Sequence, residues 1–248
     1  MSRPSWVSAF LDFPPEQYDA GVEFWEDVTG FQRSASRGPR DEFATLLPPD
    51  GDDYLRVQRV GDGEPRLHLD VHVDDLRATA EEVVADGARV VADEGDFLTL
   101  TSPGGFTFCL VTHPAGTRPR PREWPDGHVS CADQICLDIP PSRFDAEFAF
   151  WERLTGWQRR EVPLGAEFGR LIPQDDLPLQ LLVQRLDDEQ DAVSAHVDWA
   201  ASDHEAELAA HVAAGAELVA RHDGWTVLTD PTGLPYCLTM RSPAPRTA

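Results

Sequence analysis

The sequence predicts an α+β protein made of one domain duplicated in tandem, and two observations lead to this prediction. The first is an internal repeat, in which LDFPP at 11–15 recurs as LDIPP at 137–141, a shift of 126 residues from 11 to 137. From His68 onward the shift is 128 residues, from 68 to His196, because the second half carries a two-residue insertion. The second observation is that strand and helix patterns follow in the same order in both halves. Ordered matches of this length indicate duplication.

The first cycle of elements in each half is a strand, a helix and further strands. Residues 6–13 alternate in polarity as a strand does, and Pro14-Pro15 then introduces a helix. Strands are expected next at 43–48 and 54–60. The helix should bury one apolar face, formed in the two halves by Tyr18, Val22, Trp25 and Val28, and by Phe144, Phe148, Trp151 and Leu154.

The second cycle repeats this order. Residues 67–73 alternate again, and 76–85 form a helix that ends at Gly87. Strands should follow near 89–92, 97–101 and 106–111. Each half is therefore expected to contain two βαβββ modules that form a mixed sheet with helices on its outer face.

Composition sets the domain limits and the broad class. We expect domains at 1–112 and 129–241, a Pro/Arg-rich linker at 113–128 whose arginines lie against the acidic body, and a tail at 242–248. A formal net charge of −23, from 44 acidic and 21 basic residues, disfavours nucleic acid and anionic membranes as partners.

The absence of a long apolar run or signal peptide predicts a cytoplasmic protein, and four cysteines on strands predict reduced thiols. The expected partner is an unknown small molecule. The chain is expected to be a monomer or a homodimer.

Strand alternation separates the side chains that face the helices from those on the open face of each sheet. Trp6, Phe10 and Trp199 are expected on the open face as an aromatic wall. The polar residues of that face are candidates for ligand binding because many of them recur at matched positions. The predicted ligand-binding residues are Ser8, Phe10, Gln58, His68, Cys109, Gln134, Gln184, His196 and Cys237.

Three motifs carry a resemblance to a known family. They are FWEDVTG at 24–30, repeated as FWERLTG at 150–156, then HLDVHVDD at 68–75 and SPGGFTFCL at 102–110. The chain resembles the vicinal oxygen chelate superfamily of glyoxalase I, bleomycin-resistance proteins and extradiol dioxygenases, and most resembles its glyoxalase-like bacterial branch. The resemblance covers about 6–112 and 129–240 and implies cupped sheets.

The resemblance also implies where a metal would bind. Members that use a metal typically carry His or Gln on the first strand, Glu on the fourth, His on the fifth and Glu on the eighth. The matching positions here are Ser8, Gln58, His68 and Cys109 in the first half, and Gln134, Gln184, His196 and Cys237 in the second. Both glutamates are missing, and neutral amides are weak ligands for a divalent ion. The sequence therefore predicts no bound metal and no cofactor, although a His–Cys pair binds zinc when the thiol ionises.

Three functions stay open. The favoured one is a metal-independent protein that binds a small molecule in its cupped sheets. The second is a divergent metal-dependent lyase, isomerase or dioxygenase, and the third is a non-catalytic scaffold that has lost the ligand site. No catalytic residue is assigned. His68 has a structural alternative, pairing with Asp70, while His204 and His211 are expected on a helix surface because their spacing does not match a zinc-binding helix.

Overall fold

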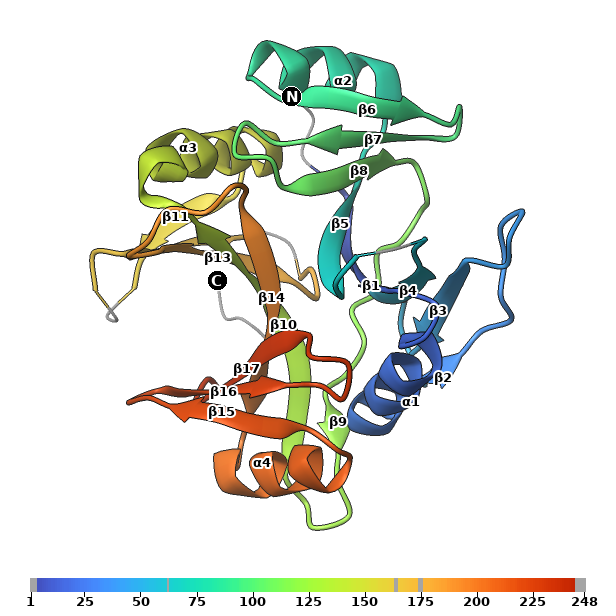
Figure 1. The fold of residues 1–248 in the computed structure, drawn as a ribbon, viewed down its shortest axis with the longest axis vertical. Coiled ribbons are helices and arrows are strands. Elements are labelled where there is room, and N and C mark those ends of the chain that lie inside the picture. Colours follow the sequence, from blue (N-terminus) through green and yellow to red (C-terminus); the bar gives the residue numbers. More distant parts are fainter. Residues whose placement is uncertain (1–3, 62, 163–164, 174–175, 244–248) are drawn as a thin grey trace. The chain divides into compact units, whose positions relative to one another are not determined.

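The computed structural model describes residues 4–61, 63–162, 165–173 and 176–243 (Figure 1). The first half contains two βαβββ modules. Their elements are β1 (Trp6–Phe13), α1 (Tyr18–Thr29), β2 (Gln32–Arg33), β3 (Phe43–Leu47) and β4 (Leu55–Arg59), and then β5 (Arg66–His72), α2 (Leu76–Ala85), β6 (Arg89–Asp93), β7 (Phe97–Thr101) and β8 (Thr107–Val111).

The second half repeats this order after a two-residue strand, β9 (Arg122–Glu123). Its elements are β10 (Val129–Ile139), a 3-10 turn (Pro141–Arg143), α3 (Phe144–Thr155), β11 (Gln158–Glu161), β12 (Phe168–Ile172) and β13 (Gln180–Arg185), and then β14 (Ser194–Ala201), α4 (His204–Ala213), β15 (Glu217–Arg221), β16 (Trp225–Thr229) and β17 (Pro235–Thr239).

The strands form two mixed sheets. Within the described residues, the first sheet has the order β2-β3-β4-β1-β5-β8-β7-β6, and the second has the order β11-β12-β13-β10-β14-β17-β16-β15, with β9 paired to β10 outside this path. The pairs β5–β8 and β14–β17 are parallel. The predicted fold class, a tandem duplication of an α+β domain with two βαβββ modules in each copy, is confirmed.

The ends of the helices follow from local chemistry. Helix α1 ends at Thr29 and is capped by Gly30, which has φ +70° and donates its N–H to the Glu26 carbonyl oxygen at 2.9 Å. This left-handed conformation favours glycine at the end of a helix. Helix α2 begins after Asp75, whose carboxylate accepts from two backbone N–H groups, and Asp203 accepts from one at the start of α4.

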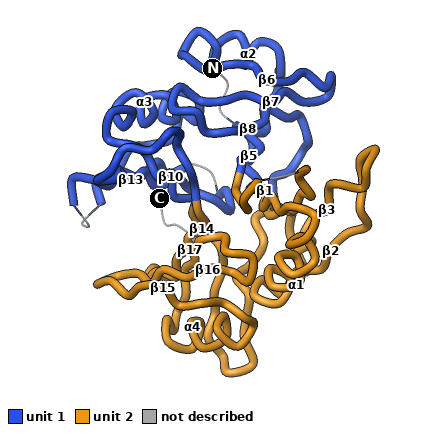
Figure 2. The backbone as a smooth tube through the Cα atoms, viewed as in Figure 1, with its two compact units in different colours: residues 1–9, 68–116, 135–195 blue, residues 10–67, 117–134, 196–248 orange. Residues whose placement is uncertain are grey.

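The described residues group into two compact units that differ from the two sequence halves (Figure 2). Unit 1 contains 1–9, 68–116 and 135–195, and unit 2 contains 10–67, 117–134 and 196–248. Each unit therefore combines most of one module from each half. The predicted limits of the two domains, the linker and the tail stay predictions, and most of the tail lies outside the described residues.

Each unit packs a helix of one half against strands of the other half. In unit 1, the Trp151 ring on α3 lies 5.4 Å from the ring of Phe108 on β8, measured between centroids. In unit 2, the Trp25 ring on α1 lies 5.6 Å from the ring of Tyr236 on β17. Both separations favour attractive edge-to-face contact. The two tryptophans are fully buried, as their helical spacing predicts.

The buried indole N–H of each tryptophan has a carboxylate acceptor, but the acceptor has a different origin in each unit. In unit 1, Trp151 Nε1 donates to Glu147 on the same helix at 2.8 Å. In unit 2, Trp25 Nε1 donates to Asp230, in the loop after β16, at 2.9 Å. The position that matches Glu147 is Gly21, a shift of 126. The duplication has therefore kept the buried hydrogen bond and exchanged the element that supplies the acceptor.

In unit 2 the Phe13 ring leaves no room for a side chain at Gly21. A Cβ atom on Gly21 would lie 2.7 Å from the Phe13 ring, whereas the second half has Ile139 at the position that matches Phe13. We expect Gly21→Ala to lower the free energy of unfolding, by about 1–3 kcal/mol before the helix propensity gained by alanine. Urea denaturation measures this change. In a Phe13→Ile background the same alanine should be tolerated, and an equal loss in both backgrounds would show that the ring contact is not the cause.

Two further expectations can be compared with the described residues. Two arginines of the predicted linker have partners in the body: Arg120 pairs with Asp50, and Arg122 donates to the Asp27 carbonyl oxygen. The placement of Trp199 on the open face is wrong. Its ring contacts Trp25 of α1 because residues alternate along β14 and Asp198 points the other way.

No helix in the described part of the chain has the length and apolar character needed to cross a membrane.

Candidate functional site

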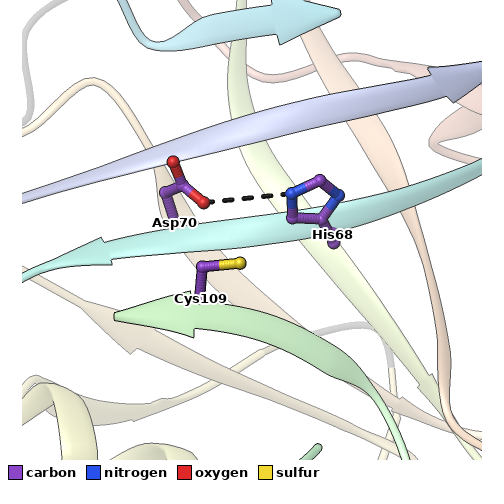
Figure 3. A group of neighbouring side chains, drawn as sticks. All are labelled: His68, Asp70 and Cys109. Carbon is purple, nitrogen blue, oxygen red and sulfur yellow. Dashed lines mark ion pairs between the residues drawn. The ribbon is translucent and has the colours of Figure 1, made fainter. Parts of the chain in front are cut away.

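A histidine, an aspartate and a cysteine meet on β5 and β8 of the first sheet, within unit 1 (Figure 3). His68, Asp70 and Cys109 are all buried, and one potential ligand atom of each lies within 4.8 Å of the other two. His68 Nε2 lies 3.9 Å from Asp70 Oδ1. This separation is too long for a hydrogen bond, but it is within the span of two ligands that each lie about 2.1 Å from one ion. We call these three residues the first triad.

Strand geometry explains how the first triad forms. Side chains two residues apart on a strand project from the same face, so His68 and Asp70 lie together on β5. Strand β8 runs parallel to β5, with Cys109 directly opposite Asp70. On the other side of β8, Thr99 of β7 lies opposite Cys109, with its Oγ1 atom 3.6 Å from Sγ.

The duplication produces a second triad in unit 2. His196, Asp198 and Cys237 meet the same criterion of 4.8 Å, and Cys237 of β17 lies directly opposite Asp198 of β14. His196 Nε2 is 3.3 Å from Asp198 Oδ1. The other carboxylate oxygen accepts a hydrogen bond from Gln134 and lies 3.6 Å from a guanidinium nitrogen of Arg241. Burial raises the pKa of Asp198, but the interactions with His196, Arg241 and Gln134 outweigh it, so the pKa is lowered overall.

In each half the structure therefore brings together three potential metal ligands. The positions that match the superfamily pattern supply only two of them, a histidine and a cysteine. The added ligands are Asp70 and Asp198, which the sequence places on the same face as the histidines. The superfamily pattern does not point to them, because it puts its carboxylates on the fourth and eighth strands. The expectation that no metal is bound stays a prediction.

The other predicted residues of unit 1 have different neighbours. Ser8 Oγ lies 2.9 Å from His72 Nε2, and His72 Nδ1 lies 2.8 Å from the carbonyl oxygen of His113. Since a carbonyl oxygen only accepts, Nδ1 carries the proton and Nε2 accepts from the Ser8 hydroxyl group. Ser8 and His72 have no exposed surface, and their hydrogen bond joins β1 to β5. Gln184 Oε1 lies 3.9 Å from Cys136 Sγ.

The predicted residues Phe10 and Gln58 share a neighbour in unit 2. The Phe10 and Phe43 ring centroids are 6.1 Å apart, and Gln58 lies opposite Phe43 in the β3–β4 pair. The Arg56 guanidinium group lies 5.8 Å from the centre of the Phe10 ring. The Gln58 amide is half-buried and has no side-chain hydrogen bond to any described residue. Of the predicted residues in unit 2, Gln134, His196 and Cys237 gather around Asp198.

Unit 2 also contains a buried polar chain that the sequence analysis missed. Glu207 of α4 accepts from His128 at 2.8 Å and from His211 at 2.9 Å, and the other nitrogen of His211 lies 2.9 Å from the Tyr236 hydroxyl oxygen. The expected surface position of His211 is wrong, because the side chain is fully buried. Leu208 shares the buried face of α4 with Glu207 and His211. The helical spacing of these three residues in the sequence indicates that they share one face of α4, and it could have predicted this group of buried polar side chains.

Comparison with solved structures finds the same fold in enzymes of known activity, all at low sequence identity. The Mn(II)-bound glyoxalase from Novosphingobium aromaticivorans is 18% identical, with a TM-score of 0.69 over 96% of this chain and 83% of that chain. The 2,2',3-trihydroxybiphenyl 1,2-dioxygenase from Sphingomonas wittichii strain RW1 is 17% identical, with a TM-score of 0.60 over 96% and 90%.

A mutant of 4-hydroxymandelate synthase from Streptomyces coelicolor is 14% identical, with a TM-score of 0.61 over 99% of this chain and 94% of that chain. At these identities the likeness shows a shared fold only. No curated protein was found to match the sequence.

The comparison with family models gives a stronger result. The model of the glyoxalase-like domain matches twice, at residues 8–111 and 134–239. The two matches cover most of the chain and agree with the repeat in the sequence and with the duplicated triads. The chain therefore belongs to the glyoxalase-like domain family, with one copy of the domain in each half.

Proposed function

We propose that this protein binds a small molecule through a divalent metal ion held by His68, Asp70 and Cys109. The observation that carries the proposal is the meeting of imidazole, carboxylate and thiol ligand atoms within 4.8 Å in one buried place. Zinc sites use these three ligand types, and catalytic ones keep three protein ligands with a further position open to water or substrate. A bound ion would supply a Lewis acid that polarises an oxygen of the small molecule.

The residues of the first triad have separate roles in this proposal. Asp70 supplies one negative charge, and Cys109 supplies a second one once its thiol has ionised. Together these two charges balance the charge of a divalent cation. His68 supplies neutral imidazole. Thiolate ligation favours zinc over harder ions such as manganese, so the metal here is expected to differ from the Mn(II) in the similar glyoxalase.

The test is a measurement of metal content on the full chain. After removal of metal with a chelator and reconstitution with zinc, elemental analysis should find one ion in the first triad. His68→Ala and Cys109→Ser should each lose that ion, because two ligands do not form a stable site. With cobalt(II) in place of zinc, the charge-transfer absorption of a metal–thiolate bond should disappear in Cys109→Ser.

Cys131→Ser is the matched control, because Cys131 lies outside the first triad and forms no disulfide. This variant should keep both the ion and the absorption band. Reconstituted protein without stoichiometric metal would contradict the proposal, as would unchanged metal content in His68→Ala.

Metal-free binding of a small molecule is the second candidate. The second triad favours it, because protein groups already satisfy the Asp198 carboxylate without a metal ion. These groups are His196, Gln134 and Arg241. The predicted ligand-binding residues near it are Gln134, His196 and Cys237. A thermal-shift screen in the presence of a chelator tests this function, because a ligand that binds only the folded state raises the melting temperature. Stabilisation that appears only with added metal would support the first candidate instead.

A further inference from the structure

A side chain outside the first triad contacts the cysteine of that triad. Thr99 of β7 lies directly opposite Cys109 in the antiparallel β7–β8 pair, and its Oγ1 atom is 3.6 Å from Cys109 Sγ. Strand β8 lies between β5 and β7, so Asp70, Cys109 and Thr99 form one row across three neighbouring strands. The thiol therefore has the carboxylate of the first triad on one side and a hydroxyl group on the other.

The alternation of β7 directs the Thr99 side chain to this place. Leu98 and Leu100 are buried on one face of β7, whereas Thr99 is half-buried on the other face. Within the described residues, the hydrogen bond with Thr99 is the only one that the Cys109 sulfur atom makes. Thr99 is therefore the hydrogen-bonding group through which β7 acts on Cys109.

The direction of this hydrogen bond depends on the state of the thiol. A neutral thiol and a hydroxyl group can each donate, but a thiolate can only accept. Metals bind the thiolate, so in the metal-bound state the Thr99 hydroxyl group is the donor. Hydrogen bonds to ionised groups are stronger than those between neutral groups. Groups that hydrogen-bond to a metal ligand orient that ligand and tune the bound metal.

We infer that Thr99 is a positioning residue of the metal site, whose hydroxyl group orients the Cys109 thiolate toward the ion and moderates electron donation from the sulfur atom. The inference rests on the proposed function of the first triad. It adds a fourth residue, which does not touch the ion and acts through one of its ligands.

The second half shows that the strand does not need a hydroxyl group at this position. The residue that matches Thr99 is Val227, a shift of 128, and it lies opposite Cys237 in the β16–β17 pair. Threonine and valine are both β-branched and both favour strands. Thr99→Val is therefore expected to fold, so that a change in its metal binding reports the lost hydrogen bond.

The experiment compares the full-length wild type with Thr99→Val, Thr99→Ser and Thr101→Val, each reconstituted with zinc or cobalt(II). Thr101 is the matched control, because it is half-buried on the same face of β7 and lies opposite Thr107 instead of a cysteine. Competition with a chelator measures the zinc affinity. Absorption spectroscopy measures the position of the thiolate-to-cobalt charge-transfer band, and melting curves establish that each variant is folded.

Thr99→Val is expected to bind zinc about tenfold more weakly than the wild type, because the thiolate loses the group that orients it. Its charge-transfer band should move to longer wavelength, since a thiolate without a hydrogen bond donates electrons more readily. Thr99→Ser keeps the hydroxyl group, so it should restore both the affinity and the band position. Thr101→Val should behave as the wild type. Thr99→Ala, which also lacks the hydroxyl group, gives the same comparison if the valine variant does not fold.

Cys109→Ser separates failure of the inference from failure of the proposed function. If the wild type holds an ion that Cys109→Ser loses, but Thr99→Val keeps the wild-type affinity and band position, the inference is overturned and the proposed function stands. The inference is also overturned if Thr99→Ser resembles Thr99→Val, or if Thr101→Val has the same effect, because the hydroxyl group of Thr99 would then not be the cause. A wild type that holds no ion in the first triad would overturn both.

Discussion

Replacing Glu147 by alanine is expected to lower the free energy of unfolding by about 3 kcal/mol or more, because two buried donors lose their acceptor. Trp151 Nε1 and the Gly104 backbone N–H donate to the two carboxylate oxygens at 2.8 and 2.7 Å. Each buried donor without a partner costs about 1–3 kcal/mol. Arg143 strengthens the same contact by donating to the Gly104 carbonyl oxygen at 2.8 Å. Urea denaturation measures the loss.

The matched control for this prediction is Asp145→Ala, on the same helix. Asp145 is exposed, so its replacement should change the free energy of unfolding by no more than about 0.5 kcal/mol. A similar small loss for Glu147→Ala would mean that the loop at 102–105 finds other acceptors. In that case the packing of α3 in unit 1 would not depend on this carboxylate.

Replacing Glu207 by alanine is expected to have an effect of similar size in unit 2. Glu207 is fully buried and accepts from both His128 and His211, so the alanine leaves two imidazole N–H groups without an acceptor. We expect a loss of about 3 kcal/mol or more in urea denaturation. Glu205→Ala is the control on the same helix, because Glu205 is exposed and pairs with Arg221 at the surface.

The same polar chain should make the protein sensitive to acid. Burial lowers the pKa of His211, an effect that its hydrogen bond to Glu207 only partly offsets. A histidine whose pKa is lower in the folded state binds fewer protons than in the unfolded state, so stability is lost as pH falls below the ordinary value of 6.5.

Urea denaturation between pH 7 and pH 5 tests the role of this histidine. His211→Gln keeps a polar side chain without a proton to gain, so its stability should fall less steeply than that of the wild type. The difference is bounded by about 1.4 kcal/mol per pH unit. Parallel curves for the two proteins would show that groups other than His211 set the acid sensitivity.

Most of the secondary structure could be predicted from the sequence because it depends on local patterns. The strand expected at 6–13 and the helix expected at 76–85 have the same limits in the structure. The missed elements are the short strands β2, β9 and β11. Two of them have two residues each, too short for alternation to be recognised, and such strands form because a neighbouring strand offers hydrogen bonds.

The candidate site could be predicted only in part. Alternation placed His68 and Asp70 on one face, and the repeat singled out Cys109. That Cys109 lies directly opposite Asp70 depends on the pairing of β5 with β8, which are separated by a helix and two strands. The expectation for Trp199 was wrong because alternation along β14 puts Trp199 on the face opposite to Asp198, and its ring contacts Trp25 of α1.

By itself, the sequence determined the duplication, the order of the elements and the sets of side chains that share a strand face, since all of these follow from periodicity and from repeated residues. Tertiary structure alone decided which charges meet. Nothing local to Arg241 indicates that it contacts Asp133 and Asp198, and nothing local to Trp25 indicates its acceptor in Asp230. Such contacts join residues that are far apart in the chain, so they depend on how strands pair and how helices pack.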